Sequence, residues 1–152
     1  MARYLILLLL PAVVACASIG QTTVQNSSRP LGNGIIHSMF MAVDGIRLGE
    51  GVWVPPADTA YRVAAGKRTL VVRVVHDPRK GYLSLSQFEA CVPVPVALKR
   101  ERVYVAEANL KNDVVSVTVK DRSTGELAGE AARANMVPLD PVKSCALDVP
   151  GK

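Results

Sequence analysis

The sequence has few of the residues on which catalytic and cofactor-binding sites usually depend. Its 152 residues include two histidines and three cysteines, and aromatic residues make up 5% of the chain. It contains no HExxH, CxxC or GxSxG motif and no glycine-rich phosphate loop, so no zinc, dithiol, serine-hydrolase or nucleotide site is indicated. The scarcity of aromatic side chains also argues against single-stranded nucleic acid, whose bases stack on such rings. We therefore expect no cofactor, no metal and no nucleic acid partner.

Long apolar runs are also missing, with one exception near the N-terminus. The run from Tyr4 to Ala15 has 12 residues, whereas a membrane-spanning helix needs roughly 20. The chain is therefore not a protein of several membrane spans. With 49% hydrophobic and 20% charged residues and a formal net charge of +5, it has the composition of one globular domain and is too apolar for a disordered chain.

The apolar run is typical of an export signal. Arg3 precedes it, Pro11 interrupts it and small residues end it, which predicts a secretory signal peptide over residues 1–15. The segment Val13-Val14-Ala15-Cys16 that follows resembles the lipobox of bacterial lipoproteins. This resemblance implies a diacylglyceryl group on the sulfur of Cys16, cleavage before that residue, and acylation of the new N-terminus, with palmitate as the typical chain. The lipid would then join the protein to a membrane.

Two locations in the cell envelope follow from this segment. The residue after the cysteine is Ala17, and in enterobacterial lipoproteins an Asp there favours the inner membrane. The resemblance therefore implies a lipoprotein of the outer membrane that faces the periplasm. Alternatively, Ala15-Cys16-Ala17 fits the small-x-small rule for ordinary cleavage, which would release a soluble periplasmic or secreted protein.

The remaining two cysteines suit an exported protein. Once Cys16 is assigned to the lipid, Cys91 and Cys145 form an even pair. An oxidising periplasm would allow them to join as a disulfide, worth about 4 kcal/mol in the chain-entropy model. The alternative is two free buried thiols.

The mature chain divides into a polar leader and one domain. Residues 16–34 comprise the lipidated N-terminus and a segment rich in Ser, Thr, Gln, Asn and Gly, which predicts a flexible tether about 25 Å long on average. Residues 35–152 form the domain. It carries short β-branched runs with turn residues every 8–12 positions, which predicts an antiparallel β-sandwich of seven or eight strands. We expect strands over Ile35–Val43, Gly51–Val54, Tyr61–Ala64, Thr69–His76, Tyr82–Cys91, Val92–Leu98, Arg102–Leu110 and Asp113–Lys120.

Three local patterns refine this prediction. Asp44-Gly45 is a strong hairpin-turn dipeptide. Pro93 and Pro95 stand two residues apart, so their missing N–H groups lie on one side of a strand, and we expect that side to be an exposed sheet edge. The run Glu126–Asn135 allows one short C-terminal helix.

Part of the domain resembles the PEGA-type module of bacterial surface and periplasmic proteins. The likeness rests on Val43-Asp44-Gly45, Pro55-Pro56, Tyr61-Arg62-Val63 and the segment from Gly66 to Val72, in which Gly66 is expected to take a positive φ. It covers about 40 residues and leaves out both cysteines. It implies a small β-sandwich with a structural or binding role and no catalytic residues.

Candidate functional side chains are few. His76 stands beside Asp77, and such a pair can orient an imidazole, although a strand-end position favours a structural role. A small hydrolase with an unrecognised site would need two or three of these groups, or of Glu89, Glu101 and Asp121, to meet in a pocket.

Binding is the other hypothesis for single residues. The candidate contacts for a partner are Trp53, which shortly precedes Pro55 and Pro56, and the basic pair Arg79 and Lys80. Basic residues in turns, among them Lys99, Arg100 and Arg102, suit anionic lipid headgroups or an acidic protein, although a solvated basic surface is the favoured interpretation.

These observations favour a lipid-anchored protein of the cell envelope with a structural or binding role, with no enzymatic activity. Its partners would be the membrane, through Cys16, and an envelope protein. One alternative is a periplasmic inhibitor or immunity-type lipoprotein that inserts a loop, either Gly49–Asp58 or Asp77–Gly81, into one enzyme or toxin. The other is the small hydrolase.

Overall fold

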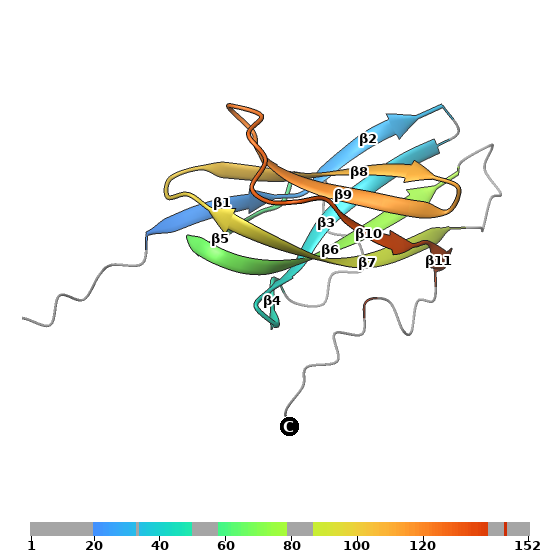
Figure 1. Cartoon of the computed structure of the whole chain (residues 1–152). Coiled ribbons are helices and arrows are strands. Elements are labelled where there is room, and N and C mark those ends of the chain that lie inside the picture. The colour runs from blue at the N-terminus through green and yellow to red at the C-terminus, as the bar shows by residue number, and fades with distance from the viewer. Residues whose placement is uncertain (1–19, 33, 50–57, 79–86, 140–144, 146–152) are drawn as a thin grey trace, which may run out of the picture.

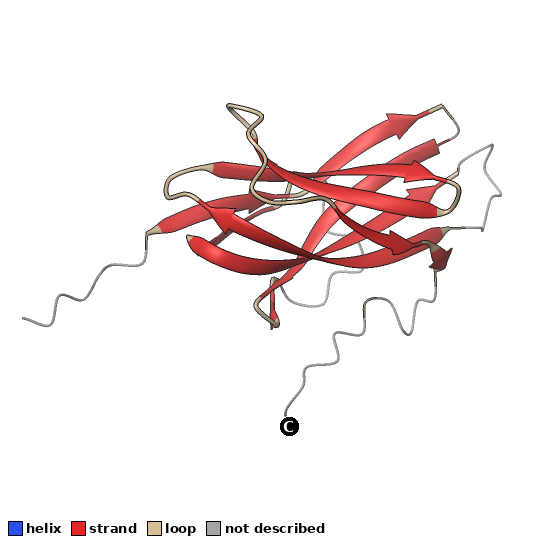
Figure 2. Ribbon diagram, viewed as in Figure 1, coloured by secondary structure: helices blue, strands red, loops and turns tan. Residues whose placement is uncertain are grey.

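Strands make up nearly all of the regular structure. The computed structural model describes residues 20–32, 34–49, 58–78, 87–139 and 145, and contains no helix within these ranges (Figure 2). The strands are β1 (Gln21–Gln25), β2 (Ser27–Leu31), β3 (Gly34–Val43), β4 (Ile46–Arg47), β5 (Ala60–Ala64), β6 (Gly66–Asp77), β7 (Phe88–Leu98), β8 (Val103–Lys111), β9 (Val114–Asp121), β10 (Ala132–Asn135) and β11 (Val137–Pro138).

The strands form two stacked sheets, as predicted for a β-sandwich. One sheet has the order β10-β9-β8-β1-β5, and the other has the order β11-β7-β6-β3-β2, with β4 paired to β3. Neighbours run antiparallel except β1 and β8, which are parallel over Thr23–Gln25 and Val103–Val105. Figure 1 shows β8 and β9 of the first sheet lying over β6 and β7 of the second.

The core lies between the sheets and follows the alternation of the sequence. In β7 the residues Val92, Val94 and Val96 are buried while Pro93 and Pro95 are exposed. This is the period of two that places successive side chains on opposite faces of a strand. The sequence prediction of two strands meeting at Cys91 is wrong, because β7 runs unbroken from Phe88 to Leu98 opposite the whole of β6.

The two proline residues mark a sheet edge, as predicted. On the side of β7 away from β6, the described strand β11 pairs only with Phe88 and Glu89. Further along this side, the N–H of Ala97 donates to the carbonyl of Ala128 at 2.7 Å. A Cβ atom at Gly129 would overlap the carbonyl oxygen of Pro95, so glycine permits this close approach.

Two hairpin turns have successive positive φ angles, one at the predicted Asp44-Gly45 and one at Asn112-Asp113. Asp44 and Gly45 take φ angles of 49° and 81° between β3 and β4, and Asn112 and Asp113 take 50° and 60° between β8 and β9. Two successive positive φ angles suit the right-handed twist of the flanking strands. The predicted hairpin of Arg102–Leu110 with Asp113–Lys120 is therefore confirmed.

The prediction of a flexible tether over residues 16–34 is wrong for its greater part. Residues 21–31 form β1 and β2, one in each sheet, and the chain changes sheets at Asn26. This side chain is buried, and its Oδ1 accepts a hydrogen bond from the N–H of Phe40 at 2.9 Å. Only Thr22 and Val24 of β1 point inward and are buried, which is too short an alternation to stand out in a polar sequence.

The predicted C-terminal helix over Glu126–Asn135 is also wrong. Its second part is β10, which pairs with β9, and no residue of its first part is helical. Alanine and glutamate are good helix formers, but helix propensity amounts to less than about 1 kcal/mol per residue, and pairing with an existing sheet overrides it. The predicted strand Gly51–Val54 and residues 82–86 lie outside the described residues.

Candidate functional site

Part of the outer face of the second sheet is buried as well as its inner face. Met39, Arg73 and Cys91 are direct neighbours across β3, β6 and β7. They point away from the core, because the alternate residues Val72 and Val74 point into it. Met39 and Arg73 are nevertheless almost completely buried. This face therefore differs from the usual solvated outer side of a sandwich.

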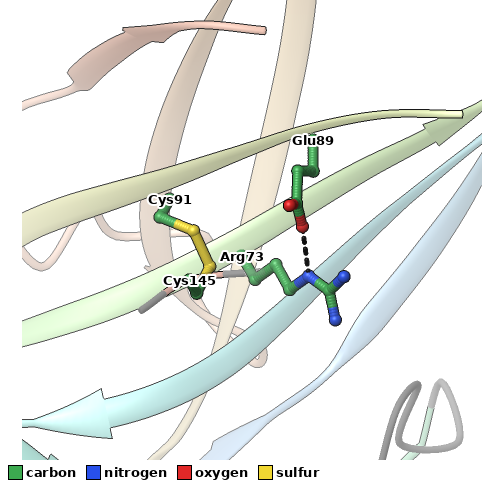
Figure 3. Close-up of a disulfide and its surroundings, with 4 residues drawn as sticks. All are labelled: Arg73, Glu89, Cys91 and Cys145. Atoms are coloured by element: carbon green, nitrogen blue, oxygen red, sulfur yellow. Dashed lines mark hydrogen bonds and ion pairs between the residues drawn. A yellow bond between two sulfur atoms is a disulfide. The ribbon is translucent and has the colours of Figure 1, made fainter. Parts of the chain in front are cut away.

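A buried ion pair is the most distinctive feature of this face. Arg73 Nε donates to Glu89 Oε2 at 2.8 Å, and the two side chains are 2% and 6% exposed (Figure 3). Burying a lone charge is very costly, so each group needs the other as a partner. The sequence marker of this site is an arginine in the middle of a valine-rich strand, and sequence reasoning did not use it.

The predicted disulfide lies next to the ion pair. Cys91 is bonded to Cys145, with Cα atoms 5.6 Å apart, and Arg73 is the cross-strand neighbour of Cys91 (Figure 3). The bond ties residue 145 to the central part of β7. The alternative of two free thiols is therefore wrong.

The five groups of the hydrolase hypothesis are spread over the sandwich. Asp77 and Glu89 lie on the outer face of the second sheet, and Glu89 is engaged by Arg73. His76 lies on the inner side of the same sheet, opposite Phe88, and its Nε2 is buried without a hydrogen-bond partner.

The other two groups, Glu101 and Asp121, lie near the start of β8, at the opposite end of the sheets. Of the pockets formed by described residues, one includes Glu101, and it contains none of the other four. Asp77, Glu89 and His76 thus lie at the same end of β6 and β7. The two acids point to the outer face of the sheet, whereas His76 points to the inner face.

Asp121 holds a turn together. It accepts hydrogen bonds from the hydroxyl and the N–H of Ser123 at 2.6 and 2.8 Å, and from the N–H of Thr124 at 3.2 Å. Arg102 lies 3.7 Å from its other oxygen. The Ser123 hydroxyl, the two backbone N–H groups and the Arg102 charge lower the pKa of the Asp121 carboxyl, against the opposing effect of desolvation. The group thus serves the structure of the turn.

A polar groove lies where the two sheets separate. Strand β8 pairs with β1 only as far as Val105, and beyond that point its edge faces β2. Ser27 Oγ donates to the carbonyl of Ala106 at 2.6 Å, and Arg29 Nη2 donates to the carbonyl of Ala108 at 2.8 Å. These side chains join strands that no backbone ladder joins. The groove has a volume of about 370 Å³ and also contains the ion pair of Lys120 with Glu107.

The predicted binding residues Trp53, Arg79 and Lys80 lie outside the described residues, as does most of each loop proposed for an inhibitor. Within the described ranges, no group of three or more His, Cys, Asp or Glu side chains is placed to hold a metal ion. The same part of the chain has no helix long and apolar enough to cross a membrane.

Fold and site together define a disulfide-bonded, mainly antiparallel β-sandwich with a buried ion pair beside the disulfide. Comparison with known proteins adds no family to this description. No family model, no curated protein and no solved structure matches the chain.

Proposed function

We propose that the protein is a lipid-anchored component of the bacterial cell envelope with a structural or binding role. The observation that carries this proposal is the disulfide between Cys91 and Cys145. Disulfides persist in oxidising compartments such as the periplasm. Because the chain has three cysteines, the bond also leaves Cys16 as the single cysteine outside a bridge, and Cys16 is the residue that the lipobox resemblance assigns to the lipid.

The resemblance to the PEGA-type module is part of this proposal. Asp44 and Gly45 adopt the turn that the module requires, and Gly66 has a φ of 107° before the paired strand β6. These conformations support the likeness at the positions that carry it. The module implies binding or structural work at the cell surface or in the periplasm.

The groove between β2 and β8 is the described surface best suited to a protein partner. It combines hydroxyl, guanidinium, ammonium and carboxylate groups with an apolar floor at Ile36. Such a mixture gives directional contacts around an apolar centre, as in many binding interfaces. The inhibitor alternative would use the same surface or the loops beyond the described residues.

The intact mass of the protein, purified from its native membrane without reductant, tests the proposal. We expect the mass of the chain from Cys16 onward plus acyl groups, lighter by two hydrogens for the disulfide. A Cys16→Ser variant should lose both the acyl mass and the membrane association that persists in a high-salt wash. A wild-type mass that shows cleavage after Ala17 and no lipid would overturn the anchor and leave a soluble periplasmic or secreted protein.

A further inference from the structure

The N-terminal segment enters the sandwich at one defined end. The carbonyl of Gly20 accepts a hydrogen bond from the N–H of Ala65 at 2.8 Å, and the carbonyl of Gln21 accepts one from the N–H of Glu101 at 2.9 Å. The first residues of β1 are thus held between the β5–β6 connection and the β7–β8 turn. In Figure 1 these three features lie together at the left of the molecule.

Basic side chains gather at this end. We define the basic end by five residues in or beside the turns at the entry point, namely Lys67 in β6, Lys99 and Arg100 in the β7–β8 turn, Arg102 before β8 and Arg122 after β9, whose guanidinium donates to Gln25 Oε1 at 2.8 Å. The N–H of Arg122 donates to the carbonyl of Val103, which places its turn beside the start of β8.

The acidic side chains of this end neutralise only part of its charge. Asp121 is buried and lies against Arg102, and Glu126 pairs with Lys99 at the surface. Lys67 and Arg100 are exposed and form no ion pair with another residue that the structure describes. Glu101 is the one further acid in these turns, so the end presents an excess of positive charge to solvent.

The position of Cys16 decides what this end faces. Gly20 stands four positions after Cys16, and four extended residues span at most about 14 Å. If Cys16 carries the lipid, as the proposed function requires, the basic end stands close to the headgroups. The Debye length is about 10 Å at 0.1 M salt, which is comparable with this maximum span, so basic side chains held within that length of the headgroups act on the surface.

We propose that the basic end docks on the anionic surface of the membrane that holds the lipid anchor. Basic residues next to an anionic leaflet gain electrostatic attraction that salt weakens. An acyl anchor combined with a basic patch also holds a protein more firmly than either does alone. Docking would fix the orientation of the sandwich, with the β8–β9 turn and β10 pointing away from the bilayer.

The test uses the unlipidated chain from Ala17 onward, which contains every described strand and both bridged cysteines. Vesicles of phosphatidylcholine alone are compared with vesicles that also contain phosphatidylglycerol, by co-sedimentation at low and high salt. We expect binding to the anionic vesicles only, with loss of binding at high salt. The variant Lys67→Glu/Arg100→Glu should lower the partition coefficient about thirtyfold or more.

A matched variant at the opposite end controls for net charge. Lys111 and Arg133 are also exposed and basic, and Lys111→Glu/Arg133→Glu changes the charge by the same amount. We expect it to lower binding by less than about twofold, because its charges lie far from the surface on the scale of the Debye length. Circular dichroism and the unreduced mass verify that each variant is folded and bridged.

The outcomes separate this inference from the proposed function. Equal binding to neutral and anionic vesicles, no binding at low salt, or equal losses in the two variants would overturn the docking of the basic end. None of these results bears on whether Cys16 is acylated, which the mass of the native protein decides. Salt-sensitive binding confined to anionic vesicles and lost in the Lys67/Arg100 variant supports the inference.

Discussion

At the scale of single residues, the pair of Arg73 and Glu89 shows how a charge is tolerated inside this sandwich. Both side chains leave the valine-rich strands on the outer face of the second sheet and are buried there. Replacing such a pair by apolar residues is often neutral, whereas removing one partner is strongly destabilising. The pair therefore contributes more to the specific arrangement of the side chains on this face than to the net stability of the protein.

Glu89→Gln should destabilise the protein by about 3 kcal/mol, because it removes the carboxylate charge to which the buried Arg73 Nε donates. Urea unfolding measures this change. The control is Glu130→Gln, which removes an exposed carboxylate and should leave the midpoint unchanged. Equal midpoints for Glu89→Gln and the wild type would show that the ion pair has no energetic role.

Asp121 gives a second residue-level prediction, in pH dependence. Because its pKa is lowered in the folded state, the carboxylate stabilises the fold above the ordinary carboxyl pKa of roughly 3.9, and this stability is lost as the pH falls through the lower folded value. Asp121→Asn should therefore be less stable than the wild type at pH 7, and the difference should vanish in strong acid. Urea midpoints measured from pH 7 to acid test this.

Ser123→Ala provides the matched comparison for this result. It removes the hydroxyl that lowers the Asp121 pKa most and leaves the carboxylate in place. The stability of Ser123→Ala should fall less steeply with decreasing pH than that of the wild type. Some pH dependence should remain, since two backbone N–H groups still bind the Asp121 carboxylate. A gap between wild type and Asp121→Asn that persists unchanged in acid would contradict the role assigned to Asp121.

At the scale of elements, both free edges of the second sheet carry proline. Pro30 lies in the edge strand β2, and Pro93 and Pro95 lie in β7 where no described strand pairs with its outer side. Proline has no N–H to offer to another strand, so it protects an edge from pairing with a second chain. The sandwich is thus built to avoid edge-to-edge association.

Pro93→Thr/Pro95→Thr should add two unpaired N–H groups to this edge and cause self-association that depends on concentration. Sedimentation velocity over a range of concentrations measures it. Ala97→Thr is the control, because it raises β propensity on the same strand while its N–H remains bonded to Ala128. A monomeric double variant at all concentrations would show that the prolines do not protect the edge.

The disulfide joins strand β7 to Cys145. Cys91 and Cys145 are 54 positions apart, and closing a loop of this length stabilises a protein by about 4 kcal/mol in the chain-entropy model. Cys91→Ser/Cys145→Ser should lose a comparable amount in urea unfolding, whereas Cys16→Ser should not change the midpoint. The same midpoint with and without reductant would argue against a stabilising bridge.

At the scale of the whole molecule, the first two strands join the sheets. Strand β1 lies between β8 and β5, and β2 closes the other sheet next to β3. Removing them would detach β5 from its only described partner and uncover the inner side of β3. The polar N-terminal segment is thus part of the folding unit.

A chain that begins at Gly34 should therefore fail to fold, whereas a chain that begins at Ala17 should keep the stability of the mature protein. Far-UV circular dichroism and urea unfolding distinguish the two. A cooperative transition in the shorter chain with the midpoint of the longer one would mean that β1 and β2 only attach to a domain that is already complete.

The sequence by itself determined the sandwich class, the hairpin turn at Asp44, the proline edge of β7 and the choice of Cys91 and Cys145 as the candidate disulfide pair. Each depends on local chemistry: a period-two alternation, two residues with positive φ, a missing N–H, or the count of cysteines. Such features lie within a few neighbouring positions, so no knowledge of distant partners is needed to find them.

The tertiary structure alone determined the secondary structure of the weakly patterned segments. Gln21–Gln25 and Ala132–Asn135 are strands because Val24 meets Tyr61 and Tyr104, and Ala134 meets Val115. Residues 126–135 have helix-forming residues, and residues 21–31 have turn and loop composition, yet backbone pairing with sheets formed elsewhere outweighs these small local preferences. For the same reason the burial of Arg73 against Glu89, and the gathering of basic turns around the entry of β1, emerged only from the pairing of strands distant in sequence.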